Sequence, residues 1–444
     1  MPRRAVVLAA ALAGIAAIAA AAWAADSSPA RAPMRPDPPP PPEATAGHAA
    51  EGPVSVPEPS TEALSYYRSG NLLWTVAVLW GLAVPAVILF SGLSARLRDW
   101  AARHARGRWL LTLLLFVAAY TTITYLVDVP LSLAGFARQH AYGLSNKTLV
   151  KWATDSAKAL GVSLIAASFL WMPYLLLARS PRRWWLYTGL AAVPFLCFVM
   201  LVSPIWIAPL FNDFGPMQDQ RLEAKILALA DRVGMDADRV YEVAKSVDTK
   251  RVNAYVTGFA GTHRIVLWDT LLARLDDDEV LFVMAHELGH YVLGHVTRGV
   301  LLSGAVVLLG LWLIHRTSGG MLRRWGARFG FTRLADPASL PLLALLLNLY
   351  GLLLSPFALA YSRHQEHQAD VFALELTQAS RPAATAFVAL QTENLSNPRP
   401  GWVFRLLRAS HPPLGERIDF ANAYRPWERG EPLRYGEWVR AAAP

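Results

Sequence analysis

The stretch Leu281–Val296, LFVMAHELGHYVLGHV, is an apolar run that contains two histidines four residues apart. Residues i and i+4 of an α-helix project from the same face, so His286 and His290 can offer imidazole nitrogens to one tetrahedral zinc ion. Glu287 lies on the neighbouring flank, where it can reach a zinc-bound water as its general base. The pattern predicts a hydrolytic zinc site. The alternative is an ordinary buried helix whose histidines are satisfied inside a bundle.

A third metal ligand must come from another part of the chain. His295 lies about 180° around the same helix from His286, so we do not expect it to bind the metal. The segment 362–377, SRHQEHQADVFALELT, follows a long apolar run and is rich in metal-binding side chains. On residue type alone, its candidate ligands are His364, Glu366, His367 and Asp370. The alternative is that they form only the solvated end of a transmembrane helix.

The composition is that of a membrane protein. Hydrophobic residues make up 54% of the 444 residues and charged residues only 17%, whereas soluble domains carry about 25% charged residues. A net charge of +9 can indicate nucleic-acid binding, but no basic motif with interleaved aromatic residues accompanies it. Arginines that hold loops at the inner membrane face explain the charge better. The single cysteine, Cys197, excludes an intrachain disulfide and a cysteine-based metal site.

Six apolar segments are candidate transmembrane helices, and most reach the roughly 20 residues needed to cross a bilayer. They are Leu72–Phe90, Trp109–Leu131, Ala159–Ala178, Trp185–Pro204, Val300–Ile314 and Leu340–Tyr361. The fifth is short, and we expect it to continue from the HELGH segment as one helix. The predicted fold class is mainly α: a polytopic membrane helical bundle with a small α+β zinc metalloprotease domain, formed by the loop before the fifth span and the C-terminal region.

The N-terminus is typical of a signal peptide, cleaved or retained as an anchor. Arg3 and Arg4 precede an Ala-rich run that ends in Ala22-Trp23-Ala24. The proline-rich segment that follows has too little apolar surface to build a core. The predicted domains are a signal peptide or signal anchor (1–24), a Pro-rich disordered linker (25–65), a four-span membrane domain (66–210), a metalloprotease region with the HELGH helix (211–298), two further spans (299–361) and a C-terminal metalloprotease region that supplies the third ligand (362–444).

The polar loop before the fifth span shows mixed α and β patterns. RLEAKILALADRVGM, residues 221–235, has the period of an amphipathic helix. RVYEVAKS at 239–246 and NAYVTGFAGTHRIVLWDTLL at 253–272 are typical of strands around a Gly-rich turn. Three aspartates, Asp276–Asp278, stand just before the HELGH run, where they can cap the N-terminus of its helix.

Arginine-rich loops predict the membrane orientation. The loops Ser94–Arg108, Arg179–Arg183 and His315–Arg333 lie on one side if the six spans alternate. The positive-inside rule assigns that side to the cytoplasm. A signal sequence also leaves residue 60 outside, so the two signals agree. We therefore predict a multi-pass protein of a bacterial inner membrane whose catalytic regions face the periplasm.

Five motifs then occur together and in a fixed order. They are PIWIAPLFNDF (204–214), NAYVTG (253–258), HELGH (286–290), the arrangement Arg363, Glu366 and Asp370, and SHPPLGERI (410–418). In these motifs the sequence resembles the integral-membrane zinc metalloproteases that include the type I CAAX prenyl proteases. The resemblance covers about residues 60–425, and the motifs are jointly specific.

The resemblance implies roles for individual residues. His286, His290 and Glu366 would bind one zinc ion. Glu287 would be the catalytic base, and Asp370, one turn after Glu366, would orient a zinc-binding histidine. The family lays its substrate as an added strand along an edge near Asn253, Ala254 and Tyr255.

His411 corresponds to a residue that lines the active site of the family. Peptide hydrolysis needs a hydrogen-bond donor for the developing oxyanion, and His411 is the candidate. The alternative is a helix-start residue whose neighbours, Pro412 and Pro413, merely shape a turn.

The predicted function is a membrane-embedded zinc endopeptidase. Its partners are the lipid bilayer and a membrane-associated polypeptide substrate, prenylated or misfolded chains being candidates, and no nucleic acid. Family members of the eukaryotic type have seven spans and face the cytosol, so the six spans and the arginine pattern favour a periplasm-facing endopeptidase over CAAX processing. One alternative is a protease of the site-2 kind, with zinc buried within the spans. Another is a non-catalytic zinc-stabilised membrane scaffold or quality-control adaptor, although a structural site needs no base such as Glu287.

Overall fold

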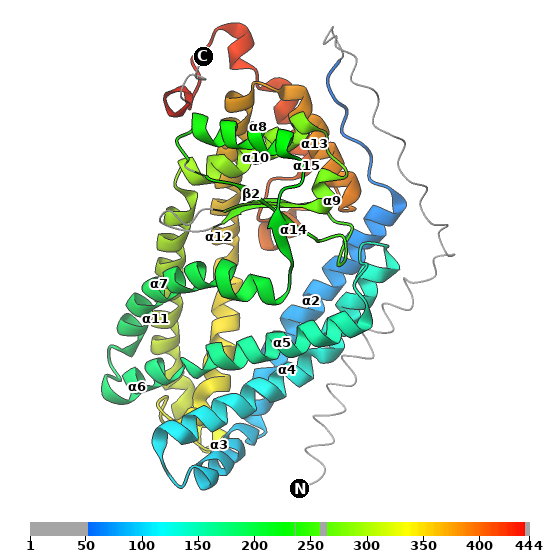
Figure 1. The fold of residues 1–444 in the computed structure, drawn as a ribbon. Helices are drawn as coiled ribbons and strands as arrows, with labels where there is room; N and C mark the ends of the chain where they lie inside the picture. Colours follow the sequence, from blue (N-terminus) through cyan, green and yellow to red (C-terminus); the bar gives the residue numbers. More distant parts are fainter. Residues whose placement is uncertain (1–51, 236, 258–263, 440–444) are drawn as a thin grey trace.

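The computed structural model describes residues 52–235, 237–257 and 264–439. The predicted signal peptide lies outside these residues. Long helices form a bundle, and a smaller mixed α and β region sits at one end of it (Figure 1). This arrangement agrees with the predicted fold class.

All six predicted spans are helices in the described part of the chain, and each is long and apolar enough to cross a membrane. They are α2 (Thr61–Phe90), α4 (Trp109–Ala141), α5 with α6 (Leu149–Ser168 and Trp171–Arg179), α7 (Trp184–Val202), α11 (His295–Phe329) and α12 (Leu340–Thr377). A helix forms the hydrogen bonds of its own backbone groups, and this is necessary in a bilayer because lipid tails offer no hydrogen-bond partners. Two short turns, Ser203–Ile207 and Ala208–Leu210, extend α7 to the sheet.

The arginine-rich loops meet at the end of the bundle opposite the sheet, near α3 (Leu93–His104) and α6 (Figure 1). Arg98 donates to the backbone oxygen of Gly330 and pairs with Asp336, which joins the first loop to the third. His315 of the third loop lies 6.4 Å from the ring of Trp184, which follows the second. The three arginine-rich segments therefore lie at one end of the bundle.

A four-stranded sheet builds the centre of the mixed region. Its strands are β1 (Phe214–Pro216), β2 (Val240–Val243), β3 (Ala254–Thr257) and β4 (Arg264–Trp268), in the order β1-β2-β4-β3. The pair β2–β4 is parallel, and the other two pairs are antiparallel. Strand β3 therefore forms an edge. The predicted amphipathic helix is α8 (Gln220–Arg232), which buries Leu222, Ile226 and Leu229.

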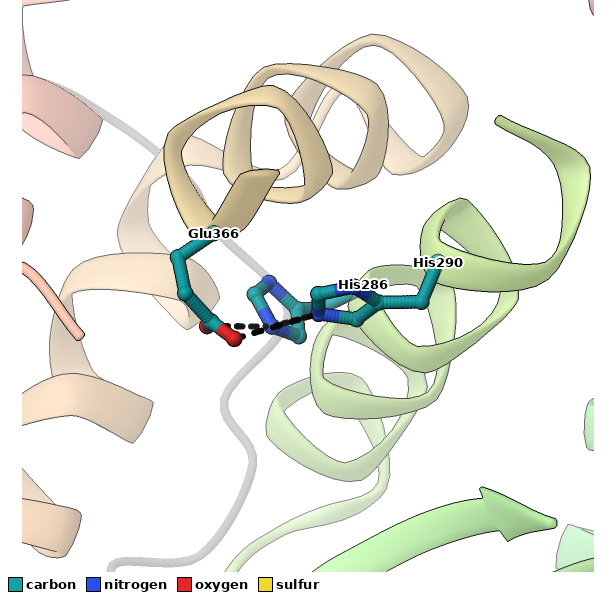
Figure 2. A group of neighbouring side chains, drawn as sticks. All are labelled: His286, His290 and Glu366. Carbon is teal, nitrogen blue, oxygen red and sulfur yellow. Dashed lines mark hydrogen bonds and ion pairs between the residues drawn. The ribbon is translucent and has the colours of Figure 1, made fainter. Parts of the chain in front are cut away.

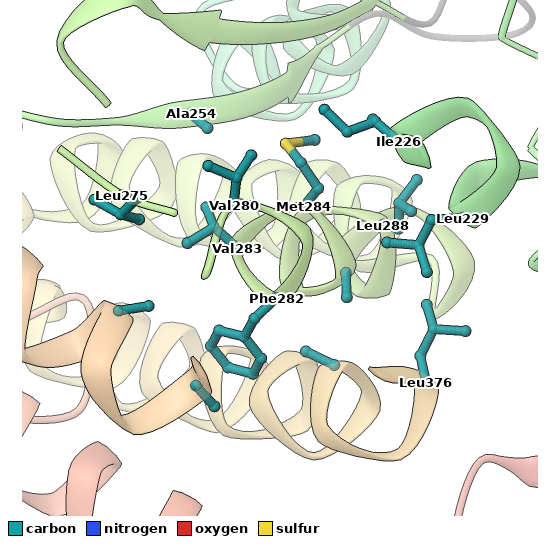
Figure 3. Packing of buried hydrophobic residues seen from close by; sticks show 14 of the residues in the cluster. Ile226, Leu229, Ala254, Leu275, Val280, Phe282, Val283, Met284, Leu288 and Leu376 are labelled. Atoms are coloured by element: carbon teal, nitrogen blue, oxygen red, sulfur yellow. The ribbon is translucent and has the colours of Figure 1, made fainter. Parts of the chain in front are cut away.

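The helix α10 (Asp277–Val292) carries the HELGH motif through the middle of the core. Asp276 caps its first turn and forms a capping box with Glu279, as the aspartate cluster predicts. Apolar residues surround the helix on several sides. Figure 3 shows Val280, Phe282, Val283, Met284 and Leu288 of α10 packed with Ile226 and Leu229 of α8, Ala254 of β3 and Leu376 of α12.

The expected continuous helix from HELGH into the fifth span is wrong. Helix α10 ends at Val292, and α11 begins anew at His295. Between them Gly294 adopts a left-handed conformation with φ of 66°. A glycine reaches this conformation without steric cost and commonly ends a helix, so the chain changes direction there.

The C-terminal region packs against α12 and α10. It contains α13 (Ser380–Glu393), α14 (Trp402–Leu407), α15 (Leu414–Ala423) and short turns at Pro426–Arg429 and Gly436–Trp438. The buried carboxylate of Glu375 accepts hydrogen bonds from the Tyr424 hydroxyl and from the amides of Arg434 and Tyr435. These bonds fasten the C-terminal turns to the end of α12.

The C-terminal end of the linker predicted to be disordered, residues 52–65, is ordered in the structure. Residues 61–65 belong to α2, and residues 52–60, here called the N-terminal strap, run extended against the C-terminal region. Val54 and the side-chain amide of Asn422 exchange two hydrogen bonds of 2.9 and 2.8 Å. Gln391 donates to the backbone oxygen of Pro57 over 2.8 Å. Proline-rich composition suits this extended path, because partners outside the segment satisfy its backbone.

Candidate active site and metal centre

Two helices bring the three predicted ligands together. His286 and His290 project from one face of α10, and Glu366 reaches them from α12 (Figure 2). The helices approach closely because residue 289 is glycine. A Cβ there would lie only 3.0 Å from Phe372 Cδ1 and 3.3 Å from Ala369 Cα.

The spacing of the ligand atoms fits a tetrahedral metal. His286 Nε2 lies 3.2 Å from His290 Nε2 and 3.2 Å from Glu366 Oε2, and His290 Nε2 lies 3.4 Å from Glu366 Oε1. Ligands placed about 2.0–2.1 Å from a tetrahedral zinc are separated by about 3.3 Å. Oε2 of Glu366 is buried and has no hydrogen bond within the described residues. This donor set suits zinc, for which two imidazoles and a carboxylate leave a fourth position open.

Asp370 holds His286 from the side opposite the cluster. His286 Nδ1 lies 2.9 Å from Asp370 Oδ1, and Arg417 Nε donates to Asp370 Oδ2 over 2.9 Å. Burial lowers the pKa of His286, but the neighbouring carboxylates of Asp370 and Glu366 outweigh it and raise the pKa to about 10. The carboxylates thus favour a positive charge here. Arg417 was not predicted, although it lies within the SHPPLGERI motif.

His295 supports His290 in the same way. Its Nδ1 lies 2.9 Å from His290 Nδ1, and its Nε2 lies 3.3 Å from Gln368 Oε1. Burial and the neighbouring His286 lower the pKa of His290 to about 3, so this imidazole stays neutral. The helical-phase argument missed this contact, because the helix breaks at Gly294 and returns His295 towards His290.

Glu287 and His411 both line one cavity of about 730 Å³, together with His286. Burial raises the pKa of Glu287 to about 7. His411 Nε2 lies 3.3 Å from Glu366 Oε1, and its Nδ1 lies 2.8 Å from the hydroxyl of Ser410. The two prolines after His411 lead into α15 and set it at the cavity rim.

Only two of the three predicted substrate-binding residues line this cavity. Asn253 and Ala254 line it beside Glu287. The Tyr255 side chain lines a separate cavity of about 130 Å³, with Pro204 and Arg264. Ala254 and Tyr255 are consecutive residues of β3, and consecutive residues of a strand point to opposite faces, which explains why they line different cavities.

Six candidate spans, a metal-ligand cluster at their end and an adjacent carboxylate define an integral-membrane metalloprotease. Two of the three ligands lie on α10, which is not a candidate span, and Glu366 lies in the C-terminal half of α12, whereas a protease of the site-2 kind would bury the cluster within the spans. The chain belongs to peptidase family M48, whose model matches residues 216–425. A second model, described as the CAAX prenyl protease N-terminal region with five membrane helices, matches residues 58–213.

Individual relatives agree with the family. The chain is 38% identical over 383 residues to a protein of Bacillus subtilis named uncharacterized metalloprotease YhfN, with 86% of this chain and 89% of that one covered. It is 30% identical over 328 residues to CAAX prenyl protease 1 of Saccharomyces cerevisiae, with 69% of this chain and 71% of that protein covered. The crystal structure of S. mikatae Ste24p superimposes with a TM-score of 0.73 and 26% identity, covering 82% and 88%. The alternative of a non-catalytic scaffold is not favoured.

Proposed function

We propose that the protein is a zinc-dependent endopeptidase that hydrolyses membrane-associated polypeptides, with prenylated or misfolded chains as candidate substrates. The observation that carries the proposal is the placement of Glu287 on the cavity wall, one residue from His286. A metal site that served only stability would need no carboxylate beside its open position.

The side chains divide the chemistry among them. His286, His290 and Glu366 would hold zinc, which when bound polarises the scissile carbonyl and acidifies water. Glu287 accepts the proton of the attacking water and passes it to the leaving amine. His411 donates a hydrogen bond to the oxygen that gains negative charge.

The edge strand β3 supplies a docking line for the substrate backbone. Among the described strands it pairs only with β4, which leaves its other side without a strand partner for a substrate to occupy, although the backbone of Val256 hydrogen-bonds Glu287. It packs beside α10, and Ala254 lines the same cavity as Glu287. A peptide bound along β3 therefore passes the metal cluster.

We also propose that the catalytic region faces the periplasm. Its support is the cluster of arginine loops at the far end of the bundle, since positively charged loops are retained in the cytoplasm. A substrate would then be a polypeptide at the outer surface of the inner membrane.

The test is Glu287→Gln, which keeps the size of the side chain and removes the base. We expect the purified variant to retain one zinc per chain by metal analysis. Hydrolysis of a quenched fluorescent peptide should fall by about 100- to 10,000-fold. Hydrolysis at the wild-type rate would refute the role of Glu287, and a zinc-loaded wild-type protein that cleaves nothing would favour the scaffold.

A further inference from the structure

Besides Arg417, three arginines line the wall of the catalytic cavity. Arg138 comes from the last turn of α4, Arg251 from the segment before β3, and Arg408 from the segment after α14. They come from parts of the chain far apart in sequence, so the fold and not a local charge run brings them to one cavity.

Arg138 is held in a prepared position. Its guanidinium carbon lies 3.7 Å from the centre of the Tyr66 ring, and Nε donates to the hydroxyl of Ser69 over 3.0 Å. Nη2 donates to the backbone oxygen of Tyr66. This close packing on α2 requires a glycine, because a Cβ at Gly70 would lie 2.7 Å from Nη2. Nη1 makes no hydrogen bond within the described residues.

Arg408 is held in a similar way. Its guanidinium lies 4.9 Å from the ring centre of Phe404 and 5.6 Å from that of Trp74, and Nη1 donates to the side chain of Asn71. Burial and the charge of Arg138 lower the pKa of Arg408. The guanidinium groups of Arg138 and Arg408 therefore repel each other in a partly buried part of the cavity.

No carboxylate of the described residues pairs with Arg138, Arg251 or Arg408 within 4.0 Å, whereas the fourth arginine of the cavity, Arg417, is paired with Asp370. Among the described residues, Glu287 supplies the only carboxylate that lines the cavity. Buried or partly buried charges are normally paired, so arginines without a carboxylate partner, two of them held by aromatic rings and neutral side chains, point to an anion supplied from outside.

We propose that Arg138, Arg251 and Arg408 form a subsite that binds a carboxylate of the substrate polypeptide. The proposal rests on the proposed endopeptidase function, because a polypeptide is then the molecule that enters the cavity. Its anionic groups are the α-carboxylate at the C-terminus and the side chains of aspartate and glutamate. The subsite would select substrates that place such a group at a set distance from the cleaved bond. A cavity of about 730 Å³ admits a short peptide segment and no folded domain.

The test measures peptide binding to zinc-loaded, full-length Glu287→Gln protein in nanodiscs, so that its result does not depend on hydrolysis. Four labelled peptides of one parent sequence are compared as two pairs. The first pair has either a free or an amidated C-terminus. The second pair is amidated and carries either glutamate or glutamine at one internal position. A charge-assisted hydrogen bond predicts about tenfold or tighter binding for one of the two charged peptides over its neutral counterpart. The favoured pair identifies which carboxylate is recognised.

The preference should depend on the arginines. We expect Arg408→Gln, added to the Glu287→Gln protein, to reduce the ratio of the two dissociation constants to below about threefold. Arg408→Lys should keep an intermediate ratio, because lysine retains the charge but not the fork of donors. The matched control is Arg399→Gln, an exposed arginine paired with Asp419 outside the cavity, which should leave the ratio unchanged.

Equal dissociation constants within both peptide pairs would overturn the subsite, as would a preference that survives Arg408→Gln. Wild-type protein that binds the charged peptide selectively but cleaves none of the four would instead contradict the endopeptidase function and leave the subsite in place. The two failures are therefore distinguishable.

Discussion

The carboxylate of Asp370 lies between an imidazole and a guanidinium, with His286 Nδ1 2.9 Å from Oδ1 and Arg417 Nε 2.9 Å from Oδ2. With Nε2 turned to the metal cluster, Nδ1 carries the proton and donates a hydrogen bond to Asp370 Oδ1. The carboxylate thus selects the tautomer of His286, and Arg417 holds the carboxylate.

Asp370→Asn should weaken zinc binding by about 10- to 100-fold, because the neutral amide orients the imidazole and raises its basicity less well. Competition with a fluorescent chelator measures the dissociation constant directly. The matched control is Asp419→Asn, an exposed aspartate of α15 that pairs with Arg399. Unchanged affinity for zinc in Asp370→Asn would show that Asp370 is dispensable for the metal.

Different residues of the site were accessible to sequence reasoning to different degrees. The spacing of His286 and His290 implies a shared helical face, so their proximity followed from helix geometry alone. Glu366 could be singled out from its neighbours only by resemblance to a family. Arg417 and His295 carry no local signal, because their contacts with Asp370 and His290 arise from tertiary packing and from a helix break.

At the level of elements, the separation of α10 from α12 decides whether the ligands meet. Both helices contribute residues to one apolar core, Phe282 and Leu288 from α10 and Leu376 from α12 (Figure 3). Gly289 sets the approach, since an added methyl group would meet Phe372 and the backbone of Ala369. The geometry of the metal cluster therefore depends on Gly289, which is not itself a metal ligand.

Gly289→Ala should lower the free energy of unfolding by about 1 kcal/mol, since overpacking costs about 2 kcal/mol and the better helix propensity of alanine returns about 1 kcal/mol. It should also weaken zinc binding by displacing Glu366. Thermal unfolding in detergent and chelator competition measure the two effects. Gly299→Ala in α11 is the control, because its Cβ would meet nothing within 4 Å. Equal apparent Tm values for the two variants would contradict this account.

Helix type was easier to predict than helix ends. The amphipathic period of 221–235 and the aspartates before HELGH matched α8 and the cap of α10. The join between HELGH and the fifth span was wrong, because the apolar pattern continues through the break. Gly294 was the available signal, but a glycine inside a helical pattern is often tolerated.

The whole molecule separates a charged end from a catalytic end. Apolar runs of sufficient length made the six spans predictable. Backbone groups inside a bilayer must hydrogen-bond within the protein, and a helix is one of the few structures that allows this. The position of the N-terminal strap was not predictable, because its hydrogen bonds are made with residues more than 300 positions away. Composition describes the intrinsic preference of such a segment and contains no information about distant partners.

Orientation is testable with single cysteines in a Cys197→Ser background expressed in a Gram-negative host. We expect Asp238→Cys, exposed in the loop before β2, to react with a membrane-impermeant maleimide in intact cells. Arg103→Cys in α3 should react only after the cells are opened, because the arginine loops remain inside. The reverse pattern would place the catalytic region in the cytoplasm.

The strap also determines where the protein can be shortened. A recombinant version that starts at the first membrane helix, Thr61, would remove the partners of the Asn422 amide and of Gln391. It would also expose apolar surface now covered by Val54 and Val56. Truncations made for expression should therefore retain Gly52 onward, even though the peptide there looks dispensable by composition.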